Sequence, residues 1–325
     1  MKKIKIGIMG YGNIGKGVEK AVDYAYDMEL VAVFTHRNPK ELAIVSQAKV
    51  MSYEQATNLK DKIDVMILCG GTSADLPEQG PKLVHDFNTV DSFDTHTKIP
   101  EYMANIDRVA KNSKKTAIIS AGWDPGLFSI MRALGEAVLP DGNFYTFWGR
   151  GVSQGHTFAI RHIEGVKNGI QYSIPIDSAV EEARSGRRPH LSARQRLTRE
   201  CYVVAHEGAD KEKIEHEIKI MPEYFADYDT TVTFISEQKF VEEHSTMPHG
   251  GRLITSGNTG TNSQIMEFSL KLESNPEFTA SVMVAYARAA FRLSNEGQYG
   301  AKTVLDIPLT YLSEKDRDIL IKELL

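Results

Sequence analysis

A glycine-rich loop near the start of the chain has the residue types and spacing of a dinucleotide-binding turn. Gly10, Gly12 and Gly15 form a G-x-G-x-x-G pattern directly after the apolar run 4–9 and directly before a helical pattern. In this setting the glycines permit a tight turn and a close approach of the backbone to a pyrophosphate, and the helix N-terminus attracts the phosphates. We predict that the loop binds a dinucleotide through Gly10, Tyr11, Gly12, Asn13, Ile14 and Gly15.

The same loop nearly matches a second kind of phosphate-binding motif. Residues 10–16 read G-x-x-x-x-G-K, as in a nucleoside triphosphatase. Such a loop needs Ser or Thr at the next position to hold Mg²⁺, and this chain has Gly17 there. We therefore favour the dinucleotide over a triphosphate.

The end of the second predicted strand bears on which dinucleotide binds. An NAD site usually carries Asp or Glu at this place, to accept a hydrogen bond from the ribose 2′-OH. Here the residues are Thr35, His36 and Arg37. A guanidinium can bind a 2′-phosphate with two hydrogen bonds, so we predict NADP; the alternative is that Arg37 is a solvated loop residue.

Two carboxylates follow predicted strands at the edge where such sheets bind ligands. Asp94 ends the run 89–94, and Asp124 follows the run 117–120 after the segment Ala-Gly-Trp at 121–123. A pair of carboxylates near a nicotinamide suits the binding of an ammonium group and the removal of protons from an amine or water. The alternative for Asp124 is to cap a helix that starts at Pro125, while Asp91 is expected to point to the other face of the sheet.

Residues 151–155 read G-x-S-x-G, the nucleophile motif of α/β-hydrolases. That motif works on one large sheet with an Asp and a His further along the chain, whereas this chain's parallel sheet is already assigned to the nucleotide. We interpret the match as accidental. A polar glycine loop here could still present N–H groups to a substrate carboxylate.

Positive charge is concentrated between residues 184 and 199, where six arginines occur without interleaved aromatic residues. A site for single-stranded nucleic acid usually combines a basic groove with stacking aromatic side chains, so nucleic acid is a poor fit. Most of these arginines are expected to be solvated. Arg199 leads into a predicted strand and is the best candidate for a rigid carboxylate anchor.

Ten histidines and two cysteines prompt a search for metal sites. Neither H-E-x-x-H nor C-x-x-C occurs, so we predict no metal. Two cysteines are too few for a disulfide framework and suit a reducing compartment. His249, on a predicted loop, is as compatible with ligand binding as with simple exposure, and Trp148 with core packing or a pocket wall.

The candidate residues require a particular arrangement of elements. In the first third of the 325 residues, short apolar runs (4–9, 30–34, 65–69, 89–93 and 117–120) alternate with helical patterns, which predicts a doubly wound parallel sheet. After residue 145 we predict an α+β region with a mixed or antiparallel sheet, including strands at 146–148, 200–205, 216–221 and 230–235. An apolar helix at 278–293 and a capping box at 313–316 that opens a short last helix close the chain.

The overall charge and hydropathy exclude other classes of protein. A net charge of −5 disfavours a protein that binds duplex nucleic acid. The longest uncharged apolar stretch, 65–71, is far shorter than the roughly 20 residues of a membrane span, and the N-terminus lacks the features of a signal peptide. We expect a cytoplasmic protein.

Several motifs together resemble one enzyme family. The glycine loop 10–15, Leu-Pro-Glu-Gln at 76–79, Gly-Trp-Asp-Pro-Gly at 122–126, Phe-Trp-Gly at 147–149, Ser-Gln-Gly-His at 153–156 and Met-Pro-His-Gly-Gly at 247–251 resemble meso-diaminopimelate dehydrogenase, and the similarity runs along the whole chain.

The resemblance implies a homodimeric, NADP-dependent enzyme of lysine biosynthesis. It would oxidatively deaminate the D-centre of meso-2,6-diaminopimelate, reversibly, to L-2-amino-6-oxopimelate and ammonia. Residues 1–124, joined by C-terminal helices from about 278 to 325, would form a Rossmann-type dinucleotide-binding domain. Residues 125–277 would form the α+β domain for substrate binding and dimerisation.

The resemblance also implies site residues. Beyond the glycine loop, the cofactor would be bound by Thr35, His36, Arg37, Cys69, Gly70, Gly71, Thr72, Ser92, Phe93, Asp94, Ala121, Gly122 and Trp123. Asp94 and Asp124 would act in catalysis, and the substrate would be bound by Asp94, Asp124, Trp148, Gln154, Gly155, Ser173, Arg199, His249 and Asn275. Ser173 replaces an expected threonine and keeps the hydroxyl, whereas His36 replaces a common arginine and leaves the strictness of NADP preference open.

Two alternatives remain. One is another two-domain reductase on the same nucleotide domain, of the dihydrodipicolinate reductase or homoserine dehydrogenase type. The other is a non-catalytic NADP sensor, which would need the glycine loop and Arg37 but not the pocket carboxylates together with Arg199.

Overall fold

The computed structural model describes residues 3–72 and 74–325. The chain forms two compact units. Unit 1 consists of Met1–Ile130 together with Pro276–Leu325, and unit 2 of Met131–Asn275. The chain therefore leaves the first unit, builds the second, and returns to the first.

Unit 1 is built on a seven-stranded sheet with the order β14-β6-β5-β4-β1-β2-β3. All neighbouring strands are parallel. The chain runs from β1 outward to β3 and then crosses to β4 on the other side of β1, which creates the reversal at which such sheets bind ligands. The strands are β1 (Ile4–Met9), β2 (Met28–Thr35), β3 (Lys49–Ser52), β4 (Val65–Leu68), β5 (Asn88–Asp91), β6 (Thr116–Ile118) and β14 (Gly300–Lys302).

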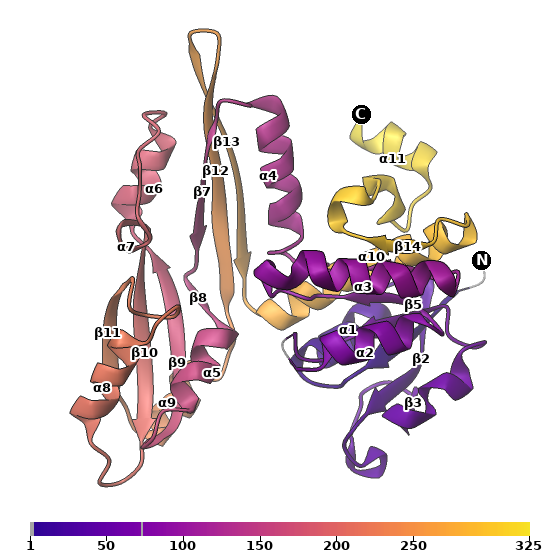
Figure 1. Ribbon diagram of the computed structural model, residues 1–325, viewed down its shortest axis with the longest axis horizontal. Helices are drawn as coiled ribbons and strands as arrows, with labels where there is room; N and C mark the ends of the chain where they lie inside the picture. Colours follow the sequence, from indigo (N-terminus) through magenta and orange to yellow (C-terminus); the bar gives the residue numbers. More distant parts are fainter. Residues whose placement is uncertain (1–2, 73) are drawn as a thin grey trace. The chain divides into compact units, whose positions relative to one another are not determined.

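Helices cover both faces of this sheet (Figure 1). Side chains of α1 (Asn13–Asp23) and α10 (Asn275–Asn295) share one core cluster with β1, β4 and β5. Side chains of α2 (Leu76–Val84) and α3 (Ile99–Asn112) share a second cluster with the opposite face. The strands are thus buried on both sides, which explains uninterrupted apolar runs such as Val65–Leu68, where all four residues are buried.

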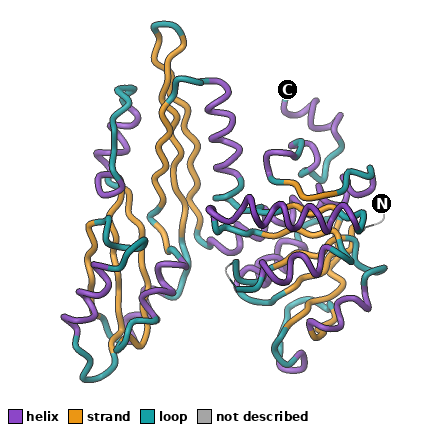
Figure 2. Tube along the Cα trace, in the orientation of Figure 1, coloured by secondary structure: helices purple, strands orange, loops and turns teal. Residues whose placement is uncertain are grey.

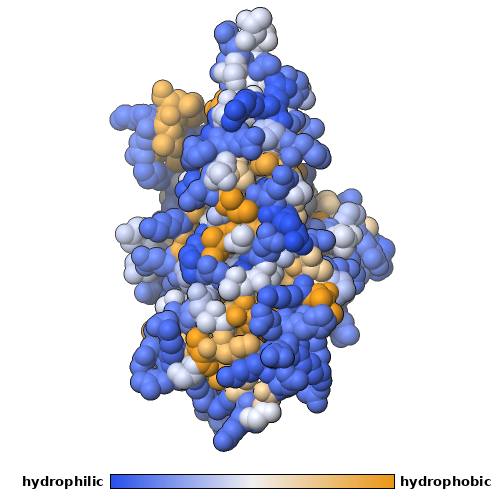
Figure 3. All heavy atoms as spheres, turned by 90° about the vertical axis from the view of Figure 1, so that its left-hand side faces the viewer, coloured by the Kyte–Doolittle hydropathy of each residue, from blue (hydrophilic) through white to orange (hydrophobic). Residues whose placement is uncertain are grey.

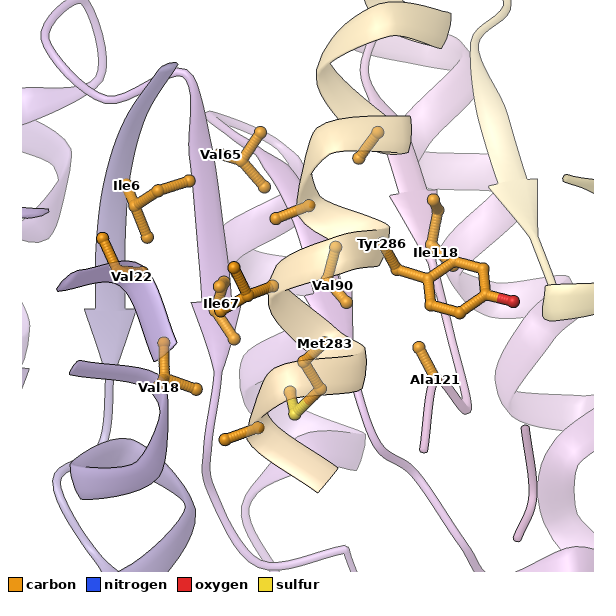
Figure 4. Packing of buried hydrophobic residues seen from close by; sticks show 14 of the residues in the cluster. Ile6, Val18, Val22, Val65, Ile67, Val90, Ile118, Ala121, Met283 and Tyr286 are labelled. Atoms are coloured by element: carbon orange, nitrogen blue, oxygen red, sulfur yellow. The ribbon is translucent and has the colours of Figure 1, made fainter. Parts of the chain in front are cut away.

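The C-terminal segment is part of the core of unit 1. Figure 4 shows Met283 and Tyr286 of α10 beside Ile67, Val90 and Ile118 of the sheet. Both α10 side chains are fully buried, and burial of one large apolar side chain contributes about 1.5–3 kcal/mol. The segment ends with β14 at the edge of the sheet and with α11 (Arg317–Leu324).

Unit 2 contains a three-stranded antiparallel sheet with the order β13-β12-β7. Its long hairpin, visible as two extended orange strands in Figure 2, turns at Gly260, whose φ of +61° lies in the left-handed region. Ala179, Val180 and Ala183 of α6 pack on the sheet in a separate core cluster. The elements are β7 (Asn143–Trp148), β12 (His249–Thr259), β13 (Asn262–Leu272), α6 (Asp177–Arg184) and α4 (Leu127–Val138), whose first residues, up to Ile130, belong to unit 1.

A four-stranded sheet with the order β11-β10-β9-β8 completes unit 2. It is mixed, because β10 and β11 are parallel while the other pairs are antiparallel. Ile214 and Ile218 of α8 cover one face, and Phe240 of α9 covers the other. The elements are β8 (Gly151–Val152), α5 (Gln154–Arg161), β9 (Val166–Pro175), α7 (Ala193–Arg196), β10 (Leu197–Ala205), α8 (Lys211–Ile220), β11 (Asp229–Phe234) and α9 (Glu237–His244).

The predicted fold class, a Rossmann-type doubly wound sheet with an α+β region, is confirmed. The strand predicted at 216–221 is wrong, because that segment lies in α8. Ile214 and Ile218 are four residues apart on its buried side, and Asp210 caps its N-terminus by accepting from the N–H of Lys213. The capping box at 313–316 is also wrong, because α11 begins at Arg317 with Asp316 as its N-cap residue.

Candidate functional site

The glycine loop of unit 1 joins β1 to α1, as predicted. Gly10 has a φ of +92°, and a Cβ on Gly15 would lie 2.2 Å from the carbonyl oxygen of Gly10, so neither position accepts a side chain without strain. Gly12 is the N-cap residue of α1, and no atom lies within 4 Å of where its Cβ would be. The backbone at this helix N-terminus is therefore accessible, as a pyrophosphate site requires.

The end of β2 is held against this loop. The N–H of Gly10 donates to the carbonyl of Phe34 at 2.9 Å, and the Nη2 of Arg37 donates to the carbonyl of Tyr11 at 2.6 Å. The N–H of Arg37 also donates to the Thr35 hydroxyl at 3.1 Å. The guanidinium of Arg37 is thus directed toward the glycine loop, and no carboxylate follows β2 within residues 35–38, so the residues present fit a 2′-phosphate.

His36 occupies a distinct environment beside Arg37. Its ring stacks on Tyr53 with centroids 4.4 Å apart, and its Nε2 lies 3.2 Å from the amide nitrogen of Gln79. Neither partner was identified from the sequence, because Tyr53 lies in a short 3-10 helix and Gln79 in α2. The tertiary structure therefore fixes the imidazole from both sides.

The carboxyl ends of β4, β5 and β6 lie side by side and carry the candidate acidic residues. Asp94 is exposed, and its N–H donates to the hydroxyl of Thr72 at 2.9 Å. Cys69, at the end of β4, donates its N–H to the carbonyl of Met9 at 2.7 Å. These bonds join the loops after β4 and β5 to each other and to β1.

Asp124 lies in a turn that precedes helix α4. The following helix, α4, begins at Leu127, and the bond between Asp124 and Pro125 is cis. The Asp-Pro pair therefore belongs to a turn between β6 and α4, and the prediction of a helix that starts at Pro125 is wrong. Asp124 is half-buried in this turn, beside the buried residues Ala121, Gly122 and Trp123.

In unit 2, strand pairing brings together segments that are far apart in the sequence. Ser173 of β9 pairs with Gly151 of β8 on one side and with Arg199 of β10 on the other. The N–H of Val152 donates to the carbonyl of Pro248 at 2.8 Å. These contacts place four predicted substrate-binding segments next to each other, namely those with Gly155, Ser173, Arg199 and His249.

Arg199 has an unusual environment for a charged residue. It is 5% exposed, and its Nη1 donates to the hydroxyl of Ser173. Its guanidinium carbon lies 4.0 Å from the ring centroid of Tyr228, close enough for a cation–π interaction. Burial lowers the pKa of Arg199 from its ordinary value, and among the described residues no carboxylate forms an ion pair with it.

A pocket of about 490 Å³ borders this arginine within unit 2. A buried guanidinium without a carboxylate is costly unless a ligand supplies the negative charge. Arg199 is therefore suited to bind an anionic group. The residues around the pocket are mostly polar: Arg194, Thr198, Arg199, Glu200, Lys219, Ala226, Tyr228, Asp229, Thr230 and Thr231. The sequence did not identify Tyr228, because an isolated tyrosine in a polar turn carries no local signal.

His249 begins β12 rather than lying on a loop, so its predicted loop position is wrong. Gly250 has a φ of +142°, and its N–H is 2.8 Å from the Nδ1 of His249. A Cβ on Gly151 would lie 2.6 Å from that imidazole. Gly151 therefore makes room for the ring of His249.

Asn275 begins α10, and its N–H donates to the carbonyl of Met247 at 2.9 Å. Trp148 ends β7 and pairs with Gly251; it is half-buried, so it is more accessible than a core tryptophan. Gly155 is exposed. The side chain of Gln154, which was also expected to contact the substrate, lies outside the part that the structure describes.

The G-x-S-x-G match has a structural explanation. Ser153 is the N-cap residue of the short helix α5, and its hydroxyl lies 2.7 Å from the Nδ1 of His156 one turn later. It follows a two-residue strand of a mixed sheet instead of a strand of the large parallel sheet. This setting differs from the strand-to-helix turn of a hydrolase.

The arginines between 184 and 199 are more ordered than expected. Arg184 pairs with Glu267 at 2.7 Å, Arg188 with Asp141 at 3.0 Å, and Arg194 with Asp229 at 2.7 Å. Arg184 and Arg188 are partly buried in these pairs, so the expectation that most of the arginines are simply solvated is wrong for these two, whereas Arg194 is exposed. Long connectors bring the acidic partners close, which spacing along the chain does not show.

Within residues 3–72 and 74–325, no group of three or more His, Cys, Asp or Glu side chains is arranged to hold a metal ion. No described helix has the length and apolar character needed to span a membrane. Figure 3 shows one face of the molecule, on which hydrophobic residues form separate patches among hydrophilic ones.

Comparison with known proteins points to one family. Residues 122–274 match the model of the diaminopimelic acid dehydrogenase C-terminal domain. The meso-diaminopimelate D-dehydrogenase of Ureibacillus thermosphaericus is 61% identical over 326 residues, covering 100% of both chains.

Solved structures agree over the whole chain. The Corynebacterium glutamicum DAP dehydrogenase in complex with DAP has a TM-score of 0.94 and 42% identity, covering 100% of both chains. An engineered D-amino acid dehydrogenase bound to NADP⁺ has a TM-score of 0.89 and 41% identity, again covering 100% of both chains. The chain therefore belongs to the meso-diaminopimelate D-dehydrogenase family.

Proposed function

We propose that the protein is an NADP-dependent amino-acid dehydrogenase that oxidatively deaminates the D-centre of meso-2,6-diaminopimelate. The products are L-2-amino-6-oxopimelate and ammonia, and the reaction is reversible. The full-length match to relatives of this activity supports the proposal. The observation in the structure that carries it is the buried Arg199, which has no carboxylate partner in the described part of the chain and suits a substrate with a carboxylate at its far end.

Unit 1 would bind the cofactor. The accessible backbone at Gly12 suits the pyrophosphate, and Arg37, held by the carbonyl of Tyr11, suits the 2′-phosphate. Residues of the loops after β4, β5 and β6 would line the rest of the site: Cys69, Gly70, Gly71, Thr72, Ser92, Phe93, Asp94, Ala121, Gly122 and Trp123. When bound, NADP⁺ would supply the hydride acceptor.

Asp94 and Asp124 would act at the reacting centre. A carboxylate can bind the substrate ammonium and can accept a proton from the amine or from the water that hydrolyses the product imine. Both residues follow adjacent parallel strands, and Asp94 is exposed to an incoming ligand. Trp148, Gln154 and Gly155 would complete the binding of the D-centre.

Residues of unit 2 would bind the distal L-centre. Arg199 would pair with its carboxylate, while Ser173, His249 and Asn275 supply further hydrogen-bonding groups. Ser173 already accepts a hydrogen bond from Arg199, which orients the guanidinium before the substrate arrives. The combination of a buried cation and two carboxylates matches a substrate that carries both carboxylates and ammonium groups.

The reductase and NADP-sensor alternatives are not favoured. The curated relatives that match across the chain are named for a D-dehydrogenase activity. A function as an NADP sensor would not require the buried Arg199 in unit 2. We propose that the protein acts in lysine biosynthesis in the cytoplasm, as the resemblance of its motifs to the family implies.

We also propose a homodimer. Leu134 and Val138 of α4 and Phe144 of β7 are 47%, 55% and 39% exposed, although all are large and apolar. A second copy of this chain would cover them. Light scattering should report twice the monomer mass, and Val138→Glu should shift the protein toward monomer. Phe158→Glu, at an exposed residue of α5, is the control; a monomeric wild type would exclude the dimer.

The activity is tested by following NADP reduction spectrophotometrically with the meso, LL and DD isomers separately. The meso isomer should be oxidised and the LL isomer should not, because it lacks a D-centre. Asp94→Ala and Asp124→Ala should each lower kcat/KM by about 100-fold or more. Asp61→Ala, at an exposed residue, is the control. The proposal fails if no isomer is oxidised while NADP still binds.

A further inference from the structure

Asp91 is a buried carboxylate to which the proposed reaction gives no role. It is the last residue of β5 and is 1% exposed. Its Oδ1 accepts from the N–H of Phe93 at 3.0 Å and from the N–H of Ser120 at 3.1 Å, and its Oδ2 accepts from the hydroxyl of Tyr102 at 2.8 Å. Among the described residues, no cationic side chain forms an ion pair with it.

Burying this carboxylate without a cationic partner has a free-energy cost. Burial raises the pKa of Asp91 to about 6, even though the bonds from Phe93, Tyr102 and Ser120 oppose the shift. An apolar side chain of similar size would avoid the cost of removing a carboxylate from water. Stability alone therefore does not explain an aspartate here.

The bonds of Asp91 connect the two loops that carry the candidate catalytic residues. Phe93 immediately precedes Asp94, and Ser120 begins the segment that leads to Asp124. The carbonyl of Asp91 also accepts from the N–H of Ala121 at 2.8 Å. One residue thus holds both loops, through its side chain and through its backbone.

The loop that follows β6 requires these stabilising hydrogen bonds because its backbone is strained at Ser120. Ser120 has a φ of +56°, a left-handed conformation that is unfavourable for a residue other than glycine. Within the described structure its own buried hydroxyl has no hydrogen-bond partner. The charge-assisted bond from the Ser120 N–H to Asp91 offsets this strain and keeps the turn toward Asp124 in place.

Tyr102 fixes the β5 loop at the same point. Its ring stacks on Phe93 with centroids 4.2 Å apart and planes 18° apart. Its hydroxyl holds the second oxygen of Asp91, so the carboxylate cannot rotate away from the two N–H groups. Phe93 is thus held through both its backbone and its ring.

We propose that Asp91 is a positioning residue that sets the relative placement of Asp94 and Asp124 for the dehydrogenase reaction. The inference rests on the proposed function of those two aspartates. Asp91 itself touches neither substrate nor cofactor in this role. A small displacement of a catalytic group can cost about 100-fold in rate, so the effect should appear in kcat.

Two substitutions of Asp91 separate positioning from packing. Asp91→Ala removes all three side-chain hydrogen bonds and should lower kcat by about 10- to 100-fold. The KM for NADP should change less than kcat does, because the glycine loop after β1 and Arg37 after β2 would still bind the phosphate groups, although Asp91 also holds Phe93 and Ala121 of the cofactor site. Asp91→Asn keeps an oxygen for both N–H groups and should restore kcat to within about 5-fold of wild type.

The control is Val22→Ala, which creates a cavity in the core beside α1; Figure 4 shows Val22 apart from Ala121 of the loop after β6. It should lower the melting temperature without lowering kcat. The inference is overturned if Asp91→Ala keeps kcat within about 3-fold of wild type, or if Asp91→Asn is as impaired as Asp91→Ala. If wild type itself does not oxidise meso-2,6-diaminopimelate, the proposed function fails instead, so the two failures are distinguishable.

Discussion

Replacing Arg288 should destabilise unit 1, because this residue joins three segments of it. Its guanidinium donates to both carboxylate oxygens of Asp27, at 2.6 and 2.7 Å, and to the carbonyl of Leu312 at 2.6 Å. The Arg288 side chain is 5% exposed, and that of Asp27 is 21% exposed. One side chain thus links α10 to the turn before β2 and to the C-terminal segment.

Arg288→Met removes the cation but keeps much of the apolar volume. Loss of one partner of a buried pair costs about 3–5 kcal/mol, and we expect about 3 kcal/mol because Asp27 can regain contact with water. For a unit of this size each kcal/mol lowers the melting temperature by about 2–4 °C, so the expected decrease is about 6–12 °C.

The stabilisation that the pair of Arg288 and Asp27 provides should decrease as pH falls. Burial would raise the pKa of Asp27, but the hydrogen bonds and charge of Arg288 outweigh burial and hold the pKa below its ordinary value. A depressed pKa stabilises the folded state above the ordinary pKa and loses that contribution as pH falls. The difference in melting temperature between wild type and Arg288→Met should therefore narrow as pH falls below about 4.

The measurement is thermal unfolding of the full chain, followed by circular dichroism at several pH values. Lys20→Met is the control, since it removes an exposed ion pair between α1 and α10 and should leave the melting temperature unchanged. Asp27→Asn combined with Arg288→Met should cost less than the sum of the single effects. A decrease under about 2 °C for Arg288→Met, or full additivity, would refute the reasoning.

Three further outcomes are expected. Arg37→Ala should raise the KM for NADP by roughly 10- to 150-fold and leave the KM for NAD nearly unchanged; equal losses for both cofactors would contradict a 2′-phosphate role. Gly15→Ala should abolish NADP binding in a fluorescence titration, because its Cβ would lie 2.2 Å from the carbonyl oxygen of Gly10; wild-type affinity would show that the loop adapts. The raised pKa of Asp91, about 6, means that its stabilising contribution is lost as pH rises from about 4 through 6. Asp91→Asn should therefore gain up to about 3 kcal/mol relative to wild type between pH 4 and pH 8 in urea unfolding, and a pH-independent difference would contradict the shift.

Most elements of unit 1 could be predicted because their signals are local. The apolar run of β1, the glycines after it and the amphipathic pattern of α3 each lie within a few residues. The strands β3 and β14, with four and three residues, are too short to form a periodic pattern and were not predicted. In unit 2, the segment of α8 was wrongly predicted to be a strand, because apolar and polar residues alternate near its end. Two isoleucines four residues apart and a capping aspartate stabilise it as a helix.

The candidate site also combines features that the sequence predicts with features that it does not. The glycine loop and the absence of a carboxylate directly after β2 can be recognised from the residue types along the chain. That Ser173 lies between Gly151 and Arg199 depends on the register of three strands, which no single segment specifies. The stacking of Tyr228 on Arg199 and of Tyr53 on His36 likewise requires contacts between separate elements.

The sequence by itself thus determined the nucleotide-binding turn, the class of sheet and the residue types that could carry the chemistry. These depend on sterics and hydrogen bonding within one turn or one strand, where neighbours in the chain are neighbours in space. Only the tertiary structure decided that Arg199 is buried without a carboxylate partner among the described residues, and that Asp91 joins two loops through the N–H groups of Phe93 and Ser120. Burial and pairing depend on which distant segment supplies the neighbouring atoms, and the folded arrangement alone determines that.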